Sequence, residues 1–331
     1  MRRHREALLA ILRSGGSGSR RWAIGRRHMK IKDIIEQQGK SISFEFFPTK
    51  REEDEPRLFD TIRRLEILKP SFVSVTYGAG GGTRKTTRHV VERIMRETSL
   101  TPMPHLTCIG QSEEELRDIL RDYRELGIEN ILALRGDPPK GTMESHPRDG
   151  FCYARDLVQL AASFDAFSIG VALYPEGHIE APSLESDLFY AKQKIEAGAD
   201  FAITQMFFDN RFFYDLVERA EKVGIRVPII PGIMPITDIE KTKRFSQMCG
   251  TTLPLSLVRS MEIAASPEEV VKIGIDFATR QCSDLWQNGV RFFHFYTLNR
   301  AETVTEVLRN LSLDRLLAEK AKQPTVANTV G

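Results

Sequence analysis

The residues of this sequence that could carry out chemistry stand directly after short apolar runs. Glu45 is the clearest case, because this acid lies among Phe44 and two further phenylalanines in the segment SFEFFP. A carboxyl group held in such surroundings resists ionisation, since desolvation disfavours its charged form. It would then suit a general acid near neutral pH. A buried ion pair with Arg135 or Arg300 is the alternative, and spacing alone does not choose between the two.

Other apolar runs also end in polar or glycine-rich residues, which a purely structural loop does not require. These residues are Thr76, Tyr77 and Gly78 in VTYGAGGGTR, His105 in PHLTC, Arg135, Gly136 and Asp137 in ALRGDPP, Tyr174 and His178 in LYPEGH, Gln205 in ITQMFFD, and residues 296–300 in HFYTLNR. One polar strand end could be a turn, whereas seven together indicate a binding or catalytic site.

Several of these residues also have a plain structural interpretation. The glycine run 78–82 could bring backbone amides close to a phosphate, or it could form a flexible loop. Asp137, followed by two prolines, could hydrogen-bond a polar heterocycle or cap a turn. His105 and His178 have no carboxylate at i+4 and no third histidine nearby in sequence, so we expect no metal. His294 lies inside an apolar run, which is typical of a core histidine.

The elements that must position these residues alternate along the chain. Short runs rich in β-forming residues occupy positions 42–46, 72–76, 103–107, 131–134, 168–172, 201–204, 228–231 and 292–295. Segments with helical periodicity lie at 57–68, 85–97, 113–125, 153–163, 184–197, 210–223 and 268–286, and an extra helix is expected near 254–264. Such alternation predicts βαβ units and a parallel sheet. Eight strands over about 270 residues fit a single-domain α/β fold, the (β/α)8 TIM barrel.

A barrel would bring the polar strand ends together. The alternative is a doubly wound open sheet, but the first strand is not followed by the G-x-G-x-x-G fingerprint of that fold. In a (β/α)8 barrel the carboxyl ends of all strands meet at one rim, where active sites lie. Alternation within the first strand points Phe44 and Phe46 toward the helices. The same alternation points Ser43, Glu45 and Phe47 toward the barrel axis.

The chain divides into a basic amino-terminal segment and a mildly acidic remainder. Residues 1–28 contain eight arginines and one acid, a net +7 that leaves −5 for residues 29–331 of the overall +2. We interpret residues 1–28 as a disordered extension, a mis-assigned start before Met29 or a transit peptide. Residues 29–315 are expected to form the catalytic barrel, and residues 316–331 a flexible tail. A mildly acidic barrel does not favour nucleic acid as a partner.

Cysteine usage and hydropathy suggest the compartment. The four cysteines are widely spaced and form neither a C-x-x-C pair nor a Cys/His cluster, so we interpret them as reduced thiols. No apolar run approaches the roughly 18 residues that a membrane span needs. We therefore expect a cytoplasmic protein without a membrane partner.

Taken together, the motifs resemble the methylenetetrahydrofolate reductase family. SFEFFP, FVSVTYGAGGGTR, PHLTCI, ALRGDPP, LYPEGH, GADFAITQMFFD, PIIPGIMPI and FHFYTLNRAE follow the order and spacing of that family over roughly residues 40–310. The resemblance implies a (β/α)8 barrel with non-covalent FAD, which NADH or NADPH reduces before the folate enters the same face. In this ping-pong cycle of one-carbon metabolism and methionine biosynthesis, 5,10-methylenetetrahydrofolate becomes 5-methyltetrahydrofolate.

The resemblance also implies roles for individual residues. Glu45 matches the general acid that protonates N10 of the folate, and Asp137 matches an acid that tunes the flavin and contacts the pterin. Positions that line FAD are matched by Tyr77, Ala79, His105, Arg135, Gly136, Ala154, Tyr174, His178, Ala181, Asp187 and Lys194. Contacts to the nicotinamide cofactor are matched by Thr76 and Gln205. Contacts to the folate are matched by Gln205, Phe245 and Arg300.

Departures and alternatives accompany this resemblance. Lys241 stands where the family often has glutamine at a folate contact, and Thr49 replaces a frequent second proline. The chain ends soon after the barrel, so we expect the short form without a regulatory domain. The alternative functions are a metal-dependent lyase or hydrolase on the same barrel, and a subunit that needs a partner to deliver electrons. By analogy we expect a homo-oligomer, while the choice between NADH and NADPH is not predicted.

Overall fold

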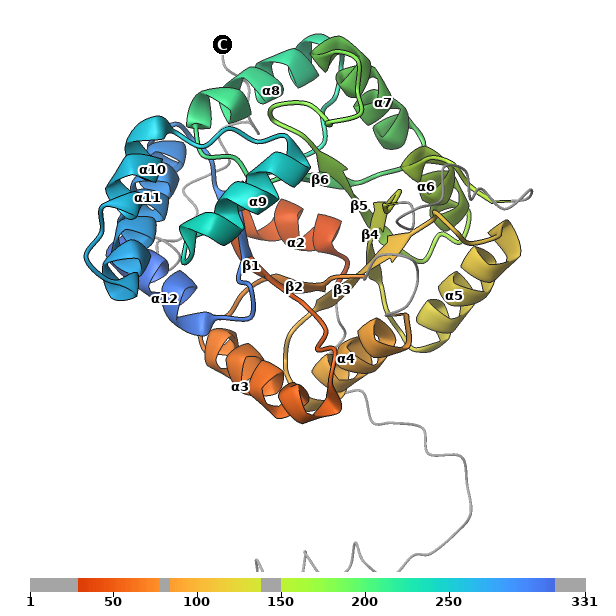
Figure 1. Ribbon diagram of the computed structural model, residues 1–331. Coiled ribbons are helices and arrows are strands. Elements are labelled where there is room, and N and C mark those ends of the chain that lie inside the picture. Colours follow the sequence, from red (N-terminus) through yellow and green to blue (C-terminus); the bar gives the residue numbers. More distant parts are fainter. Residues whose placement is uncertain (1–28, 78–83, 138–149, 313–331) are drawn as a thin grey trace, which may run out of the picture.

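The strands of this chain form one parallel sheet. A computed structural model describes residues 29–77, 84–137 and 150–312. Within them, nine strands pair in the order β7-β6-β5-β4-β3-β2-β1-β9-β8 (Figure 1). Their bounds are β1 Ser41–Phe46, β2 Phe72–Val75, β3 Pro102–Thr107, β4 Asn130–Leu134, β5 Ser168–Leu173, β6 Phe201–Thr204, β7 Ile229–Ile230, β8 Gly232–Ile233 and β9 Phe292–Tyr296. Each predicted strand is present, and most bounds agree to within one residue.

The two terminal strands of this order are halves of a single strand. Only Pro231 separates β7 from β8, and β7 pairs with β6 while β8 pairs with β9. Proline has no backbone N–H and interrupts the ladder, but the Pro231 carbonyl still accepts the N–H of His294 at 3.0 Å. The sheet therefore closes into an eight-stranded barrel, which confirms the predicted fold class.

Helices surround the barrel in an outer ring (Figure 1). They are α3 Glu55–Glu66, α4 Arg84–Glu97, α5 Glu113–Glu125, α6 Ala154–Ala162, α7 Leu184–Glu196, α8 Asn210–Lys222, α10 Leu255–Glu262, α11 Pro267–Gln287 and α12 Ala301–Asn310. Helix α5 shows how local sequence sets such bounds, because Ser112 and Glu115 form a reciprocal capping box at its start. Its buried face carries Leu116, Ile119, Leu120 and Tyr123 at helical spacing.

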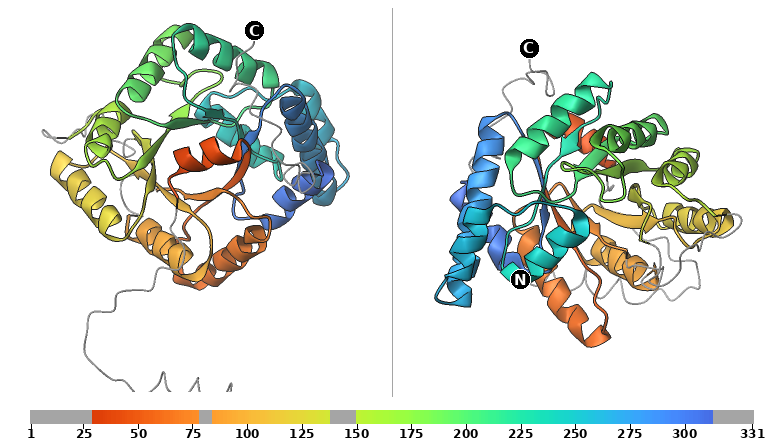
Figure 2. Two further views of the ribbon diagram at one scale, coloured as in Figure 1. Left: turned by 180° about the vertical axis from the view of Figure 1, so that it is seen from behind. Right: turned by 45° about the horizontal axis from the view of Figure 1, so that its top comes forward.

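Helix α2 (Ile31–Gln38), which the sequence analysis does not predict, fills the amino-terminal end of the barrel. It lies at the centre of the reverse view in Figure 2. The N–H of Ile31 donates to Asn130 Oδ1 at 2.7 Å, and the N–H of Lys32 donates to Ser168 Oγ at 3.2 Å. Asn130 and Ser168 are the first residues of β4 and β5. Ile31 and Ile35 pack on the side chains inside the barrel, so this end is closed.

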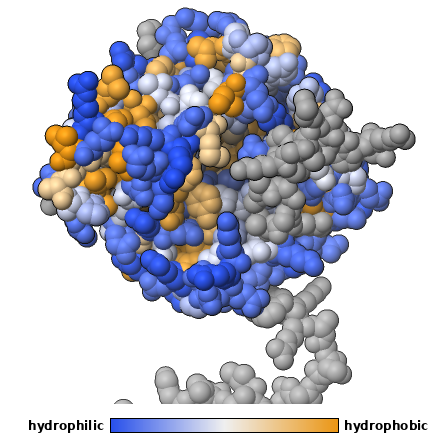
Figure 3. Space-filling view, in the orientation of Figure 1, coloured by the Kyte–Doolittle hydropathy of each residue, from blue (hydrophilic) through white to orange (hydrophobic). Residues whose placement is uncertain are grey.

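Helix α9 (Ile239–Cys249) lies across the opposite face, where the carboxyl ends of the strands meet (Figure 1). Asp238 caps the helix by accepting the Lys241 N–H at 3.0 Å. Figure 3 shows this face, with apolar residues gathered at the left over the α10 region and mostly hydrophilic residues over α9. Met248, Leu255 and Ile263 are exposed apolar side chains of this part of the chain.

Side chains of the strands separate into two layers, as alternation along a strand requires. Phe44 and Phe46 belong to the apolar layer between the strands and the helices. Phe72, Met103 and Phe201 belong to the smaller cluster inside the barrel. The direction predicted for Phe44 and Phe46 is therefore confirmed.

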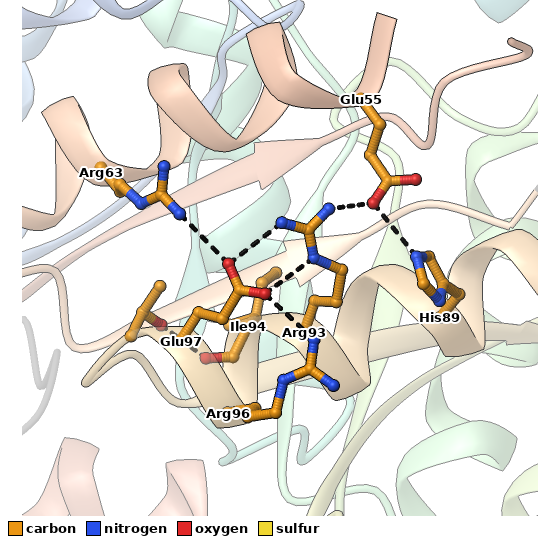
Figure 4. Close-up of polar contacts among 8 residues, drawn as sticks. Glu55, Arg63, His89, Arg93, Ile94, Arg96 and Glu97 are labelled. Atoms are coloured by element: carbon orange, nitrogen blue, oxygen red, sulfur yellow. Dashed lines mark hydrogen bonds and ion pairs between the residues drawn. The ribbon is translucent and has the colours of Figure 1, made fainter. Parts of the chain in front are cut away.

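A charged network joins α3 and α4 on the outside of the barrel (Figure 4). The Glu97 carboxylate binds Arg63, Arg93 and Arg96, and Arg93 also binds Glu55. The Arg93 guanidinium lies 3.7 Å from the centre of the Phe59 ring, which adds a cation–π contact. These groups lie on the outer surface and hold two neighbouring helices together.

The described part of the chain contains no helix that is long and apolar enough to cross a bilayer. It also contains no group of three His, Cys, Asp or Glu side chains placed to hold a metal ion. All four cysteines are free.

Candidate active site

Glu45 lies at the carboxyl end of β1, inside the barrel. Its side chain is only 7% exposed. Glu45 Oε2 lies 3.3 Å from His105 Nε2 on β3 and 3.7 Å from His294 Nε2 on β9. Ser74 Oγ on β2 approaches the same oxygen at 3.5 Å. The predicted direction of Glu45 is confirmed, and its neighbours are two imidazoles and a hydroxyl.

Contacts with the Ser43 hydroxyl orient the His294 ring. The Ser43 hydroxyl donates to Phe293 O at 3.2 Å and lies 2.8 Å from His294 Nδ1. The contact with Nδ1 holds the ring in place, and which of the two groups donates depends on the tautomer of His294. His294 Nε2 then faces Glu45. The core location predicted for His294 is correct, but its position next to the acid is not apparent from its own run of sequence.

The ionisation of Glu45 differs from the sequence-based expectation. Burial raises the pKa of Glu45. Polar contacts with His105 and His294, together with the charges of these rings, lower it by a larger amount, so the net pKa is about 2. The expected rise through desolvation is therefore wrong in its net direction, since imidazoles from two distant strands oppose it.

The alternative interpretation of Glu45, a buried ion pair with Arg135 or Arg300, is not found among the described residues. Arg135 forms an ion pair with Glu180, in which Arg135 Nη2 lies 2.9 Å from Glu180 Oε1. Arg300 lies outside the barrel interior and lines a pocket of about 320 Å³ with Thr49, Arg57 and other residues.

The ends of β4 and β5 and helix α7 form a wall beside this interior site. Lys194 Nζ donates to Ala172 O at 2.5 Å and lies 5.9 Å from the centre of the Tyr174 ring. Burial lowers the pKa of Lys194 to about 8, although the Asp187 carboxylate acts in the opposite direction. Burial likewise raises the pKa of Asp187. The wall thus combines a cation, a carboxylate and an aromatic ring.

The turn after β5 brings two more predicted residues to this wall. The His178 ring meets the Tyr174 ring edge to face, with 4.7 Å between their centres. His178 Nδ1 accepts the Glu180 N–H at 3.1 Å, and the His178 carbonyl accepts the Ala181 N–H at 2.8 Å. Burial lowers the pKa of His178, so its ring is favoured in the neutral form.

The strand end after β4 depends on a glycine. Gly136 has a φ of +84°, and a Cβ atom there would lie 2.8 Å from Thr107 Cβ. Only glycine meets both conditions without strain. This turn leaves the predicted residue Asp137 exposed at the rim, next to Arg135.

The remaining predicted residues lie at other points of the rim. Thr76 donates its N–H to Phe46 O at 3.0 Å, and Tyr77 beside it is 9% exposed. Gln205 Oε1 accepts the N–H of Met206 at 2.9 Å. Ala154 is the first residue of α6. Ala79 lies outside the described residues.

Helix α9 carries two of the predicted folate contacts. Phe245 is 36% exposed. Lys241 is exposed too, and its Nζ lies 3.3 Å from Asp238 Oδ2, the carboxylate that caps the helix. Neither residue has a described contact with Glu45, so both lie on the rim and not beside Glu45 inside the barrel.

The residues present suit a cofactor that joins a flat ring system to phosphates. His105 Nε2 is buried, yet it makes no hydrogen bond of regular geometry with the described residues. Lys194 and Arg135 supply cations that phosphates bind, and Tyr174 supplies an aromatic surface. FAD has this combination of parts.

The sequence points Ser43 toward the barrel axis and His294 into the core, but it assigns neither of them, nor Ser74, to the group of side chains around Glu45. Each lies an even number of residues from a group at a strand end, Ser43 from Glu45 and His294 from Tyr296. Applying alternation to every strand would have placed all three of them inside the barrel.

The fold and site define a class of protein: a (β/α)8-barrel enzyme with an acid inside the barrel and its site at the carboxyl ends of the strands. The family model described as methylenetetrahydrofolate reductase matches residues 30–312. The chain belongs to the methylenetetrahydrofolate reductase family and is an oxidoreductase.

Relatives from bacteria and plants agree with this assignment. The chain is 42% identical over 290 residues to the 5,10-methylenetetrahydrofolate reductase of Salmonella typhimurium, covering 87% of this chain and 96% of that one. It is 40% identical over 297 residues to methylenetetrahydrofolate reductase (NADH) 1 of Arabidopsis thaliana, covering 86% of this chain and 50% of that one.

A solved structure is similar in fold alone. It belongs to an uncharacterised protein from Clostridium thermocellum that binds two copies of 5-methyl-5,6,7,8-tetrahydrofolic acid. The TM-score is 0.62 at 14% sequence identity, over 86% of this chain and 99% of that one.

Proposed function

We propose that this protein reduces 5,10-methylenetetrahydrofolate to 5-methyltetrahydrofolate with electrons from NADH or NADPH. The observation that carries the proposal is Glu45, an acid inside the barrel with two imidazoles within 3.7 Å of one carboxyl oxygen. Reduction of the folate requires a proton at N10 as well as a hydride, and this group can hold that proton. Membership of the family supports the choice of substrate.

The cofactor of the proposal is FAD, bound along the wall formed by Arg135, Tyr174, His178, Asp187 and Lys194. When bound, FAD would take a hydride from the nicotinamide and give it to the folate. Lys194 and Arg135 would bind phosphate oxygens, while the Tyr174 ring would lie beside a flat part of the cofactor. Both substrates would use the same open face in succession, because α2 closes the other end of the barrel.

Glu45 is the proposed general acid. In the protein without ligands, the contacts of Glu45 with His105 and His294 lower its pKa and favour the ionised carboxylate. We therefore place the transferable proton on the group formed by Glu45, His105 and His294. Glu45 delivers it to N10, which opens the five-membered ring and leaves an iminium carbon ready to accept hydride.

The remaining rim residues are proposed to recognise the substrates. Thr76 and Gln205 would contact the nicotinamide, and Gln205 and Asp137 would contact the pterin. Phe245, Lys241 and Arg300 would contact the rest of the folate. The catalytic barrel of this proposal spans residues 29–315 and works as a homo-oligomer in the cytoplasm, and delivery of electrons by a second subunit is an outcome that the experiment below detects.

The visible absorption spectrum of the purified protein tests this proposal. We expect oxidised-flavin bands that bleach anaerobically with NADH or NADPH and recover when 5,10-methylenetetrahydrofolate is added. Bands that bleach only with dithionite, and then recover with the folate, would indicate a separate electron-delivering subunit. A protein that binds no FAD on reconstitution would contradict the proposal.

A further inference from the structure

The loop that follows β9 is bound to the end of β1 through three hydrogen bonds. The Thr297 hydroxyl donates to Glu45 O at 2.6 Å. The Asn299 side chain accepts the Phe47 N–H at 2.9 Å through Oδ1 and donates to Phe47 O at 2.8 Å through Nδ2. The backbone on both sides of Phe46 is therefore fixed from one neighbouring loop.

These bonds continue the pairing of β1 with β9 beyond its last register position. The backbone pairing ends at Glu45 with Tyr296. After that point, side chains of the loop take the place of backbone groups, and the Asn299 amide offers one donor and one acceptor as a strand residue would. On its other side β1 stays paired with β2 through Phe46, so these bonds hold the β9 side of the end of the strand.

The loop adopts an unusual backbone to present these groups. Leu298 and Asn299 have φ values of 49° and 57°, two consecutive non-glycine residues in the left-handed region. Asparagine tolerates this region, whereas leucine rarely enters it. Such conformations persist where the surroundings hold them and cluster at functional sites. Here the Asn299 N–H donates to Thr297 Oγ1 at 3.1 Å, and Thr61 Oγ1, which also has Arg57 O at 3.1 Å, lies 3.4 Å from Asn299 O.

We propose that Asn299 is a positioning residue for the general acid and acts through the backbone of Phe47 and Glu45. The proposal rests on the function proposed above for Glu45. Glu45 must keep its carboxyl within reach of His105 and His294 inside the barrel, and β1 has no further backbone partner on the β9 side to hold its end. The two hydrogen bonds between the Asn299 amide and the Phe47 backbone fix the end of β1. They thereby fix the direction in which the Glu45 side chain points.

The variants Asn299→Asp and Asn299→Gly distinguish the effect of the Asn299 side-chain amide from the effect of its left-handed backbone conformation. Aspartate keeps the size of the side chain but replaces the donor facing Phe47 O with a second acceptor. Glycine keeps the left-handed backbone free of strain and removes the amide. Thr297→Val removes the hydroxyl that binds Glu45 O. The matched control is Asn288→Asp at the end of α11, whose amide binds Asp284 on the outer surface.

The experiment measures the two half-reactions of each holoenzyme separately by stopped-flow absorbance, after circular dichroism has shown that the variant is folded. We expect reduction of the flavin by NADH or NADPH to stay within about twofold of wild type. We expect folate reduction to slow by about tenfold or more in both Asn299 variants and in Thr297→Val, a part of the 10² to 10⁴ that general acid catalysis supplies. Its pH profile should shift as well, because the acid moves relative to the imidazoles.

Equal loss in both half-reactions would overturn the inference, since a merely structural role weakens them together. Unchanged folate reduction in the Asn299 variants would overturn it too, and would leave the proposed function intact. A wild-type protein that fails to reduce the folate would remove the proposed function itself, so the two failures are distinguishable.

Discussion

Lys194 is a cation in a poorly solvated position, with its ammonium group against Ala172 O and the Tyr174 ring. Burial lowers its pKa from 10.5 to about 8. That difference corresponds to roughly 3 kcal/mol by which the fold disfavours the charged form. A buried cation of this kind suits the proposed contact of Lys194 with a negatively charged part of FAD.

Replacing Lys194 should therefore stabilise the flavin-free protein and weaken cofactor binding. At pH 7, Lys194→Met is expected to raise the free energy of unfolding by about 1–3 kcal/mol, because no charge is then buried. The folded-state pKa lies below the unfolded value, so the unfolded state binds more protons between pH 8 and 10.5, and wild-type stability rises with pH in that window. The gain from the substitution should shrink there. Urea unfolding at pH 7 and 9.5, with a titration of FAD, measures both effects.

Lys192→Met is the matched control, because Lys192 lies on the same helix and pairs with Glu196 near the surface. It should change neither stability nor FAD affinity by a comparable amount. If Lys194→Met destabilised the flavin-free protein at pH 7, the argument from burial would be wrong.

Individual site residues could be predicted where a polar side chain follows an apolar run. Glu45, Arg135 and Lys194 were found in this way or through the family motifs, and the structure places Glu45 inside the barrel and the other two on the neighbouring wall. The ionisation of Glu45 could not be predicted, because it depends on His105 and His294 on other strands. Local sequence does not contain those distances.

At the scale of elements, the barrel depends on α2 to close its amino-terminal end. Ile31 is fully buried against the side chains inside the barrel. Ile31→Ala is expected to lower the free energy of unfolding by about 2–5 kcal/mol through lost burial and a residual cavity. Steady-state activity at a temperature where the variant stays folded should change little, because the site lies at the other end.

Chemical denaturation measures the free energy of unfolding of Ile31→Ala, and an activity assay measures its steady-state rate. Glu36→Ala serves as the control, since Glu36 is exposed on the same helix and should leave stability within about 0.5 kcal/mol. A loss of stability for Ile31→Ala no larger than that of the control would show that α2 is not part of the cooperative fold.

The strands could be predicted with greater certainty than the helices of the two barrel ends. Strand runs are continuous and apolar because both faces of a parallel sheet are covered. The buried residues of helix α9 are the polar Thr242 and Ser246, so this helix has no buried apolar stripe and was not predicted. Helix α2 has too few turns for its three isoleucines to establish a periodic pattern.

At the scale of the whole molecule, closure of the barrel brings distant parts of the chain to one site. Ser43 and His294 are 251 residues apart and lie 2.8 Å from each other at their polar atoms. The predicted βαβ alternation determined the fold class and the rim, since each unit follows a fixed handedness. It could not give the pairs of residues that meet across the barrel, because those depend on shear and side-chain packing.

The most direct test of the account compares the two half-reactions of Glu45→Gln by anaerobic stopped-flow absorbance. The amide keeps the shape of the side chain but cannot deliver a proton. Flavin reduction by NADH or NADPH should stay within about twofold of wild type, and folate reduction should fall by about 10² to 10⁴. Glu36→Gln should leave both rates unchanged. An equal loss in both half-reactions, or folate reduction at the wild-type rate, would contradict the assignment of Glu45 as the general acid.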